Sequence, residues 1–217
     1  MFYSSLLALV FVNSWFSFLV SPAQPLLPLE EAVLTVRSTF SIRTAQARDL
    51  GSTAEILADS FHERSGIMGW IFPLLRLGIH EDLKNRLRSA PPHYGCLVAR
   101  VDQAEELAGT IEVALRLPPV WQSLHPHYPY ISNLAVRKLY RRQGAAMQLL
   151  IACERLVLLW GFEDLYLHVL ENNYEARRLY LKAGYQLRGV EQNWWSWLLG
   201  HPKRLFLHKH LRPSGSV

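Results

Sequence analysis

The spacing of hydrophobic positions changes several times along this chain, and each change marks the start of a different structural element. Leu50, Ala54, Leu57 and Phe61 recur at the 3.6-residue period of an amphipathic helix. Just before them, apolar and polar residues alternate in "FSIRTA", which is typical of a half-buried strand starting at Phe40. A strand followed by a helix therefore opens the folded part of the chain.

The same reasoning predicts the elements of the remaining chain. Two apolar runs joined by a polar link predict a hairpin, and a Pro-Pro pair closes the helix before it. Glycines and Pro73 interrupt the apolar segment 62–79, which we interpret as a loop or short helix at the rim. The expected elements are a strand at 40–45, helices at 45–61 and 80–90, strands at 94–102, 106–118 and 130–136, a helix at 144–160, a strand at 165–170, a helix at 174–183, and strands near 185–192 and 203–211.

This order of elements predicts one α/β (α+β) domain, whose sheet mixes parallel and antiparallel strands and carries helices on both faces. Helix 144–160 supports that architecture, because apart from Gln148, Glu154 and Arg155 it is apolar almost all round. Such a helix is enclosed on most sides. The length of 217 residues also suits a single domain.

The first thirty residues do not continue this pattern. The run 4–20 is apolar but interrupted by polar residues, and a spanning helix needs about 20 apolar residues. It lacks the basic start of a secretory signal, and a Pro-rich linker follows it. We therefore expect 1–30 to lie outside the fold. Three alternatives stay open: a marginal anchor with membrane contact through residues 1–20, a targeting remnant, or an extension that is translated but is not part of the domain.

Charge and cysteine usage narrow the range of partners. The net charge of +5 favours a phosphorylated cofactor, a nucleic acid or a membrane surface. The basic residues gather at one strand–helix junction without aromatic–basic interleaving, which argues against a nucleic acid. Cys96 and Cys153 lie in apolar runs and are expected to be buried, reduced thiols. His125 and His127 lack a third ligand, so we expect no metal site.

The junction itself, "NLAVRKLYRRQGAA" at 133–146, connects a strand to the long helix. The first amides of a helix have no acceptor within the helix and lie at the positive end of its dipole, which makes an anion site. Gly144 lets a bulky anion approach the main chain, and Ala145 and Ala146 keep the next positions small. The pattern fits a diphosphate; the alternative is an ordinary helix start with solvated arginines.

Two motifs, one at this junction and one after it, carry a resemblance to a known family. Residues 141–146 read R-x-x-G-x-A, and residues 173–185 read N-x-x-A-x-x-x-Y-x-x-x-G-Y. In this order and separation they resemble the GNAT superfamily of N-acetyltransferases, whose acetyl-CoA signature is (R/Q)-x-x-G-x-(G/A). The resemblance covers roughly 40–211 and is strongest over 130–186. "SNLAV" and "RLFLHKHL" look most like plastid and cyanobacterial members.

The resemblance implies a GNAT domain over 38–212, with a strongly twisted mixed sheet and a V-shaped splay between two central parallel strands. Acetyl-CoA, the co-substrate, would lie in that splay, with its pantetheine arm paired to one strand and its diphosphate on the turn. Arg141 would cap the turn or meet a phosphate. Asn172 would cap the next helix together with Glu175, while Asn173 touches the cofactor. The implied acetyl-CoA residues are Leu134, Ala135, Val136, Arg141, Arg142, Gln143, Gly144, Ala145, Ala146 and Asn173.

The same resemblance makes Tyr180 the general acid, which donates a proton to the departing CoA thiolate after direct attack by an amine. Helical periodicity alone would make Tyr180 a core aromatic residue. For the general base we expect Glu112, in the middle of a strand. An equally open alternative is that Glu112 faces solvent on an alternating strand. His168 is a weaker candidate base.

The acceptor, by the same resemblance, lies between the first helix–loop–helix and the last hairpin, whose loops are unusually apolar here. We expect a groove for a peptide or an apolar amine; the alternatives are loops that pack on one another or touch a membrane. The leading function is an acetyl-CoA-dependent N-acetyltransferase of protein N-termini or lysines, in the cytoplasm or the plastid stroma. The alternatives are a small-molecule amine acetyltransferase and a non-catalytic acyl-CoA-binding module. The expected groove residues are Trp70, Phe72, Asn133, Trp194, Trp195 and Trp197.

Overall fold

The computed structural model describes residues 40–65, 72–89, 91–102, 104, 106–117, 127–191 and 202–211 of the chain. At 61–65 and 72–76 only the backbone is described. The expected extension at 1–30 lies outside the described residues, so it stays a prediction, and the same holds for the domain bounds 38–212.

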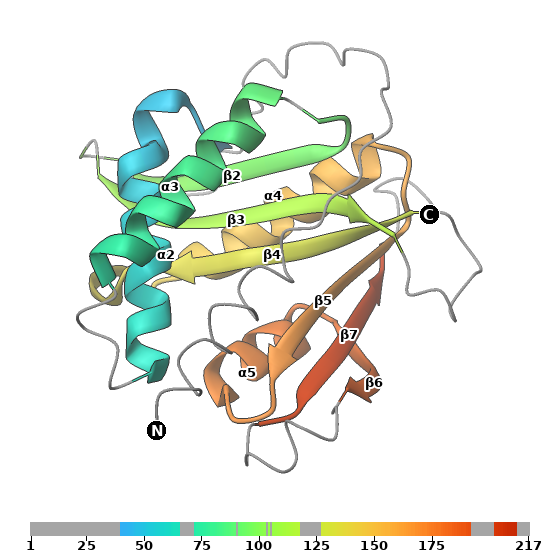
Figure 1. The fold of residues 1–217 in the computed structure, drawn as a ribbon. Helices are drawn as coiled ribbons and strands as arrows, with labels where there is room; N and C mark the ends of the chain where they lie inside the picture. The colour runs from blue at the N-terminus through green and yellow to red at the C-terminus, as the bar shows by residue number, and fades with distance from the viewer. Residues whose placement is uncertain are drawn as a thin grey trace, which may run out of the picture.

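The described strands form one seven-stranded mixed sheet in the order β1-β2-β3-β4-β5-β7-β6 (Figure 1). Neighbouring strands are antiparallel except for β4 and β5, which run parallel. The order of elements along the chain is the predicted one, with two short 3-10 turns added. The elements are β1 (Phe40–Thr44), η1 (Ala47–Asp49), α2 (Leu50–Ser65), α3 (Phe72–Ser89), β2 (Tyr94–Val101), β3 (Leu107–Arg116), β4 (Tyr128–Val136), η2 (Lys138–Tyr140), α4 (Ala145–Leu159), β5 (Asp164–Leu170), α5 (Tyr174–Lys182), β6 (Gln186–Glu191) and β7 (Arg204–His210).

Helices cover the two faces of the sheet unequally. On one face, α4 packs on β2 and β3 through buried residues such as Ile111 and Leu149. On the other face, α2 packs on β3 and β4, and Val98 belongs to the core there. Figure 1 shows α2 and α3 in front of β2 to β4, whereas β5 and β7 carry no described helix on that face. The described helices therefore cover only the β2 to β4 part of this face.

The two parallel strands part soon after they meet. β4 and β5 pair only at Tyr130 with Tyr166 and at Ile131 with Leu167, although both strands continue for several residues. The expected V-shaped splay between the central strands is thus confirmed. From 132 to 136, β4 pairs with β3 alone, so its other edge faces the gap.

A bulge in β4 accompanies this separation. The β3–β4 register shifts between Thr110 and Glu112, and Asn133 opposite them has the left-handed φ of 53°. Gly109 permits the close approach of the strands beyond the bulge, because a Cβ there would lie 2.7 Å from the carbonyl oxygen of Ala135. The bulge also turns the Asn133 side chain toward β3.

The helix predicted at 45–61 is observed at Leu50–Ser65, and the start of the next helix differs more from its prediction. α3 begins at Phe72, eight residues before the expected start at 80, so the predicted rim loop or short helix at 62–79 gives way to regular helix from 72 onward. Pro73 is compatible with this start, because the amides of a first turn have no acceptor within the helix. The proline therefore marks the beginning of α3 and does not interrupt it.

Two further findings concern the cysteines and the helices of the described residues. Cys96 and Cys153 are free, buried thiols as expected, and burial raises the pKa of each well above the ordinary range. Among the described helices, none has the length and apolar character needed to span a bilayer.

Candidate active site

The turn between β4 and α4 presents an uncrowded main chain. Gly144 has φ 94° and Arg142 has φ 66°, both in the left-handed region that glycine favours. A Cβ added at Gly144 would find its nearest neighbour, the Nε2 atom of Gln148, at 3.9 Å. The space in front of this glycine is therefore open, as the anion-site prediction requires.

The amides that start α4 have no protein partner among the described residues. The first helical bond runs from the amide of Gln148 to the carbonyl oxygen of Gly144, at 3.1 Å. No hydrogen bond within the described part of the chain uses the amides of 144–147 as donors, and Gly144 supplies no side-chain cap. Donors in this position bind phosphate groups.

Side chains of the turn mostly fold back on it. The Nε atom of Arg141 donates to the carbonyl oxygen of Val136 at 3.1 Å, while the expected contact of Arg141 with a phosphate stays a prediction. Gln143 donates from Nε2 to the carbonyl oxygen of Leu139 at 2.8 Å. Arg137, which adds to the positive charge expected there, instead pairs with Glu55 at 2.8 Å. The main chain, more than these side chains, faces the open space.

The cap of α5 lies one residue later than expected. The Oδ1 atom of Asn173 accepts from the amide of Ala176 at 3.2 Å, so Asn173 is the N-cap and the assignment of that role to Asn172 is wrong. The reason is spacing, because a cap oxygen reaches the third amide of its helix. Glu175, the expected partner in that cap, instead pairs with Arg142 at 3.2 Å. This exposed pair joins the turn to the start of α5.

Glu112 is enclosed, so the solvent-facing alternative is wrong. It is 1 % exposed, and its carboxylate accepts from Arg86 at 2.8 Å, from Asn133 at 2.9 Å and from Tyr94 at 3.2 Å. Strand alternation fails as a guide here because β3 is buried on both faces from Leu107 to Val113. The three donors satisfy the carboxylate and tie α3 to the bulge at Asn133.

A tyrosine–histidine contact lies at the apex of the splay. The Tyr130 hydroxyl and Nδ1 of His168 are 2.9 Å apart, across the two strands where their pairing ends. Nε2 of His168 is buried and lies 3.1 Å from Glu191, although at an angle that makes no hydrogen bond. Burial, followed by the charge of Arg204, lowers the pKa of His168 to about 4. The imidazole is therefore neutral near pH 7.

Tyr180 lies in the core formed by α4, α5 and the sheet. It is 7 % exposed, and its ring meets that of Tyr185 edge-on with centroids 5.8 Å apart. The helical stripe that includes Ala176 and Leu179 packs on the same cluster. Burial agrees with the expectation from periodicity, while the role of Tyr180 as a general acid stays a prediction.

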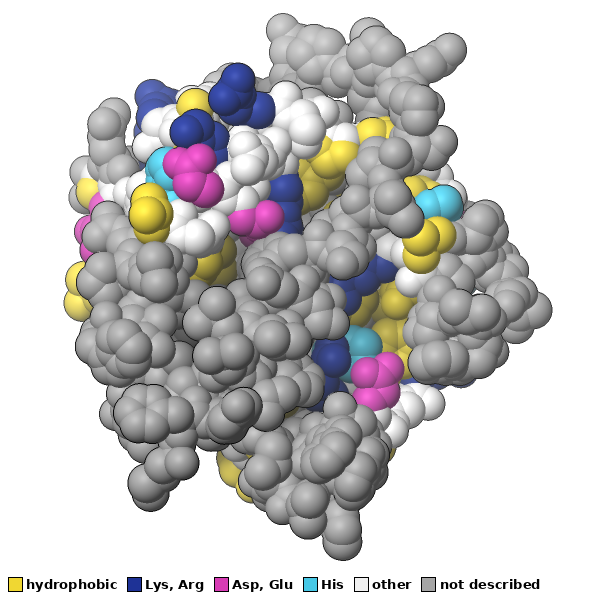
Figure 2. Space-filling model, viewed as in Figure 1, with side chains coloured by type: hydrophobic (Ala, Val, Ile, Leu, Met, Phe, Trp, Pro, Cys, Tyr) yellow, Lys and Arg dark blue, Asp and Glu magenta, His cyan; other side chains and the backbone are white. Residues whose placement is uncertain are grey.

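The face of β4, β5 and β7 that no described helix covers carries an aromatic cluster that the sequence analysis missed. Tyr166 stacks on Phe206 with centroids 5.4 Å apart, and the edge of Tyr128 meets Tyr166 at 5.2 Å. The signal was present as aromatic residues two apart on each strand, in "YPY", "YLH" and "FLH". Figure 2 shows described hydrophobic, basic, acidic and histidine side chains next to one another on this side of the molecule.

Most of the expected acceptor groove cannot be placed. Trp70, Trp194, Trp195 and Trp197 lie outside the described residues, and only the backbone of Phe72 is described. Asn133 is half-buried, and its Nδ2 donates to Glu112. The predicted groove therefore stays a prediction.

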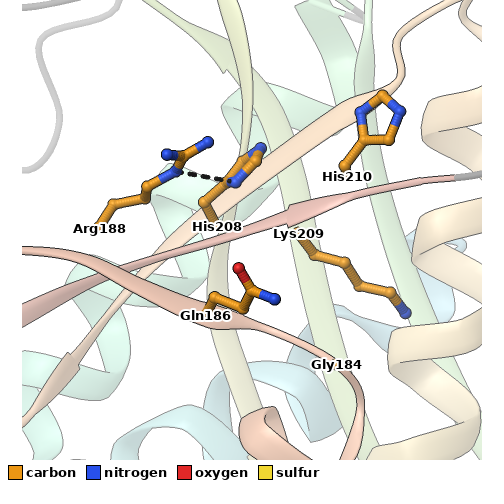
Figure 3. A pocket seen from close by; sticks show the side chains of 6 residues that line it. All are labelled: Gly184, Gln186, Arg188, His208, Lys209 and His210. Carbon is orange, nitrogen blue, oxygen red and sulfur yellow. Dashed lines mark hydrogen bonds between the residues drawn. The ribbon is translucent and has the colours of Figure 1, made fainter.

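A separate cleft of about 300 Å³ lies away from the splay, between β6 and the far end of β7 (Figure 3). His208 accepts from Arg188 at 3.2 Å and contacts Asp164 at 2.7 Å, so its groups are already paired. Among the described residues, no cluster of His, Cys, Asp or Glu could hold a metal ion. The cleft is lined by Gly184, Gln186, Arg188, His208, Lys209 and His210.

Comparison with known proteins is consistent with this geometry. The model of the acetyltransferase (GNAT) family matches residues 55–185. GCN5-related N-acetyltransferase 10, chloroplastic, of Arabidopsis thaliana is 32 % identical over 165 residues, covering 71 % of this chain and 64 % of that protein. GCN5-related N-acetyltransferase 5, chloroplastic, of the same plant is 30 % identical over 163 residues, covering 67 % and 51 %. The chain thus spans less than two thirds of the length of these relatives.

Solved structures share the fold. A ribosomal-protein-alanine N-acetyltransferase from Brucella melitensis superposes with a TM-score of 0.60 at 21 % identity, covering 78 % of this chain and 99 % of that one. The PaiA N-acetyltransferase from Thermoplasma acidophilum, solved in complex with coenzyme A, gives 0.60 at 20 % identity, covering 79 % and 98 %. At these identities the likeness concerns the fold.

Proposed function

The chain belongs to the GNAT family of acetyltransferases, and from this premise we propose that it transfers the acetyl group of acetyl-CoA directly to a primary amine of a protein N-terminus or lysine. The observation that carries the proposal is the row of amides at 144–147, which have no partner among the described residues and open α4 beside the splay of β4 and β5. Free donors at a helix start suit a diphosphate, and an unpaired strand edge suits a pantetheine arm.

The residues present fit acetyl-CoA. Gly144 leaves open space over the turn, and Leu134, Ala135 and Val136 lie on the β4 stretch whose edge faces the gap. Nδ2 of Asn173 has no hydrogen bond among the described residues, so it remains available to a ligand. Acetyl-CoA is therefore proposed as the co-substrate.

The proposed chemistry needs a neutral amine, an acid and a base. The amine nitrogen attacks the thioester carbonyl, the C–S bond breaks, and Tyr180 gives a proton to the departing thiolate. For the base, the geometry supports His168 better than Glu112. The carboxylate of Glu112 is held by three donors, whereas Nε2 of His168 is buried without a hydrogen bond at the apex of the splay. A neutral imidazole accepts the proton that the nitrogen loses once its C–N bond forms.

The nature of the amine follows from the same requirement. An α-amine has a pKa of about 8 and a lysine amine about 10.4, so the α-amine is neutral far more often at pH 7. We expect protein N-termini to react faster than lysines. The two Arabidopsis relatives are named chloroplastic, which supports a plastid location for this chain as well.

Peptide acetylation followed by mass spectrometry tests the proposal. The full chain is incubated with acetyl-CoA and a mixed peptide library, and products are scored for α- and ε-acetylation. We expect acetylated N-termini first, with lysines following at higher pH. Tight acetyl-CoA binding without any acetylated peptide would contradict the proposal and favour a non-catalytic acyl-CoA-binding module. Acetylation of added small amines alone would favour a small-molecule acetyltransferase.

A further inference from the structure

The cleft between β6 and β7 is lined by hydrogen-bond donors and by no acidic side chain. Its six lining residues include two basic residues and two histidines but no Asp or Glu. Gln186 and Arg188 come from β6, and the histidines come from the far end of β7 (Figure 3). The volume of about 300 Å³ lies at the lower end of the range for small-molecule sites. Such a lining suits a small ligand that carries several acceptor atoms.

Arg188 is held in a defined orientation by His208. Its Nε atom donates to Nδ1 of the imidazole at 3.2 Å, so Nδ1 carries no proton. The ring proton is therefore on Nε2, which donates to Asp164 at 2.7 Å. The two outer nitrogens of the guanidinium make no hydrogen bond with any described residue. A guanidinium oriented in this way loses little conformational freedom when it binds an anion.

Two more side chains of the cleft have groups left for a ligand. The exposed amide of Gln186 has no hydrogen bond among the described residues. His210 contacts Asp164 through Nδ1 at 3.1 Å, so its Nε2 can accept from a phosphate hydroxyl, or donate once the ring is protonated. Lys209 extends to the other side of β7 in Figure 3, and its Nζ atom contacts Glu154 at 2.7 Å. The amide and the imidazole, more than the lysine, therefore add to the guanidinium.

We propose that this cleft binds a small phosphomonoester, with its phosphate oxygens on the outer nitrogens of Arg188 and on the amide of Gln186. A planar guanidinium binds two phosphate oxygens side by side through charge-assisted hydrogen bonds. A phosphate ion alone is much smaller than the ligands of sites of this volume, so the organic part of the ester fits as well. Binding here does not require acetyl transfer and is independent of the proposed function.

Calorimetry with glycerol 3-phosphate tests the proposal. The full chain is first saturated with acetyl-CoA, so that the turn at Gly144 is occupied and does not take up the added phosphate. Inorganic phosphate and glycerol are the comparison ligands. We expect glycerol 3-phosphate to bind more tightly than inorganic phosphate, and glycerol not to bind. The NMR signals of His208 and His210 should shift during the titration, because both rings line the cleft.

Variants of the cleft assign the binding to its donors. Arg188→Gln should weaken the binding of glycerol 3-phosphate about tenfold or more, because it removes the charged hydrogen-bond donors. Gln186→Glu keeps the size of the side chain but adds a negative charge to the lining, so it should abolish measurable binding. Arg48→Gln, which removes the same charge from an exposed position in η1, is the control and should bind like the wild-type protein. Circular dichroism establishes that each variant is folded.

The opposite results would overturn the proposal. Unchanged affinity in Arg188→Gln or in Gln186→Glu would show that the phosphate binds elsewhere. Binding that acetyl-CoA abolishes would assign the phosphate to the turn at Gly144 instead. Equal affinity for inorganic phosphate and glycerol 3-phosphate would contradict a site for an ester. Each of these results leaves the proposed acetyl transfer in place, because neither cleft variant alters the splay or the turn.

Discussion

The Tyr130 hydroxyl and Nδ1 of His168 lie 2.9 Å apart and join the two central strands at the point where they separate. Beyond this contact β4 and β5 no longer pair, so it marks the closed end of the gap. The same pair lies under the charges of Arg116 and Arg204. One contact therefore links the shape of the splay to the electrostatics of its inner end.

The first prediction concerns stability at low pH. Burial lowers the pKa of His168 from 6.5 to about 4, so between these values the unfolded chain binds a proton that the folded chain does not. The folded state should therefore lose about 2 kcal/mol through this residue as the pH falls from 7.5 to 5. Urea unfolding at the two pH values should show a smaller loss for His168→Gln. His210→Gln, which changes a 58 % exposed side chain, is the control. Equal losses in all three proteins would contradict the assignment.

The second prediction concerns the turn at Gly144. Gly144→Leu should abolish measurable acetyl-CoA binding in calorimetry, because the side chain would fill the open space over the amides. Gly144→Ala should weaken binding much less. The alanine variant has the same left-handed backbone strain as the leucine variant, about 1–2 kcal/mol, but its side chain adds little bulk. Unaltered affinity in the Leu variant would rule out the main-chain cradle.

Sequence patterns were sufficient for the elements and for the turn, because both depend on local spacing. The period of α4 and the R-x-x-G-x-A motif at its start can be recognised in one short segment. The contact between Tyr130 and His168 cannot, since it joins residues 38 apart and depends on the register of two parallel strands.

The other predictions that the structure corrected also failed for physical reasons. The alternation of β3 carried no information about Glu112, because α2 and α4 bury that strand from both sides. Asn172 and Asn173 are both good caps, and a shift of one residue decides which of them reaches the amide of Ala176. A proline such as Pro73 can either interrupt a helix or occupy its first turn. The sequence looks the same in both cases, and only the backbone structure distinguishes them.

The third prediction concerns the general acid. Tyr180→Phe should slow acetyl transfer about a hundredfold or more while acetyl-CoA affinity stays near the wild-type value, because only the proton donor is lost. Tyr185→Phe is the matched control, since its ring packs against Tyr180 and its hydroxyl is buried without a described hydrogen bond. Pre-steady-state rates with one peptide acceptor provide the measurement. An unchanged rate in Tyr180→Phe would remove this residue from the chemistry.

The fourth prediction separates the two roles open to Glu112. If its carboxylate holds α3 and the bulge in place, Glu112→Gln and Arg86→Gln should both destabilise the protein by about 2–4 kcal/mol, because each breaks the buried ion pair between these two side chains, although in Glu112→Gln Arg86 keeps its ion pair with Asp82. In both variants the shape of the pH profile of kcat/KM should stay the same as in the wild-type protein. If Glu112 is instead the base, Glu112→Gln alone should flatten the acidic limb of that profile, and Arg86→Gln should shift the limb. Urea unfolding and pH profiles of the two variants therefore distinguish a positioning residue from a proton acceptor.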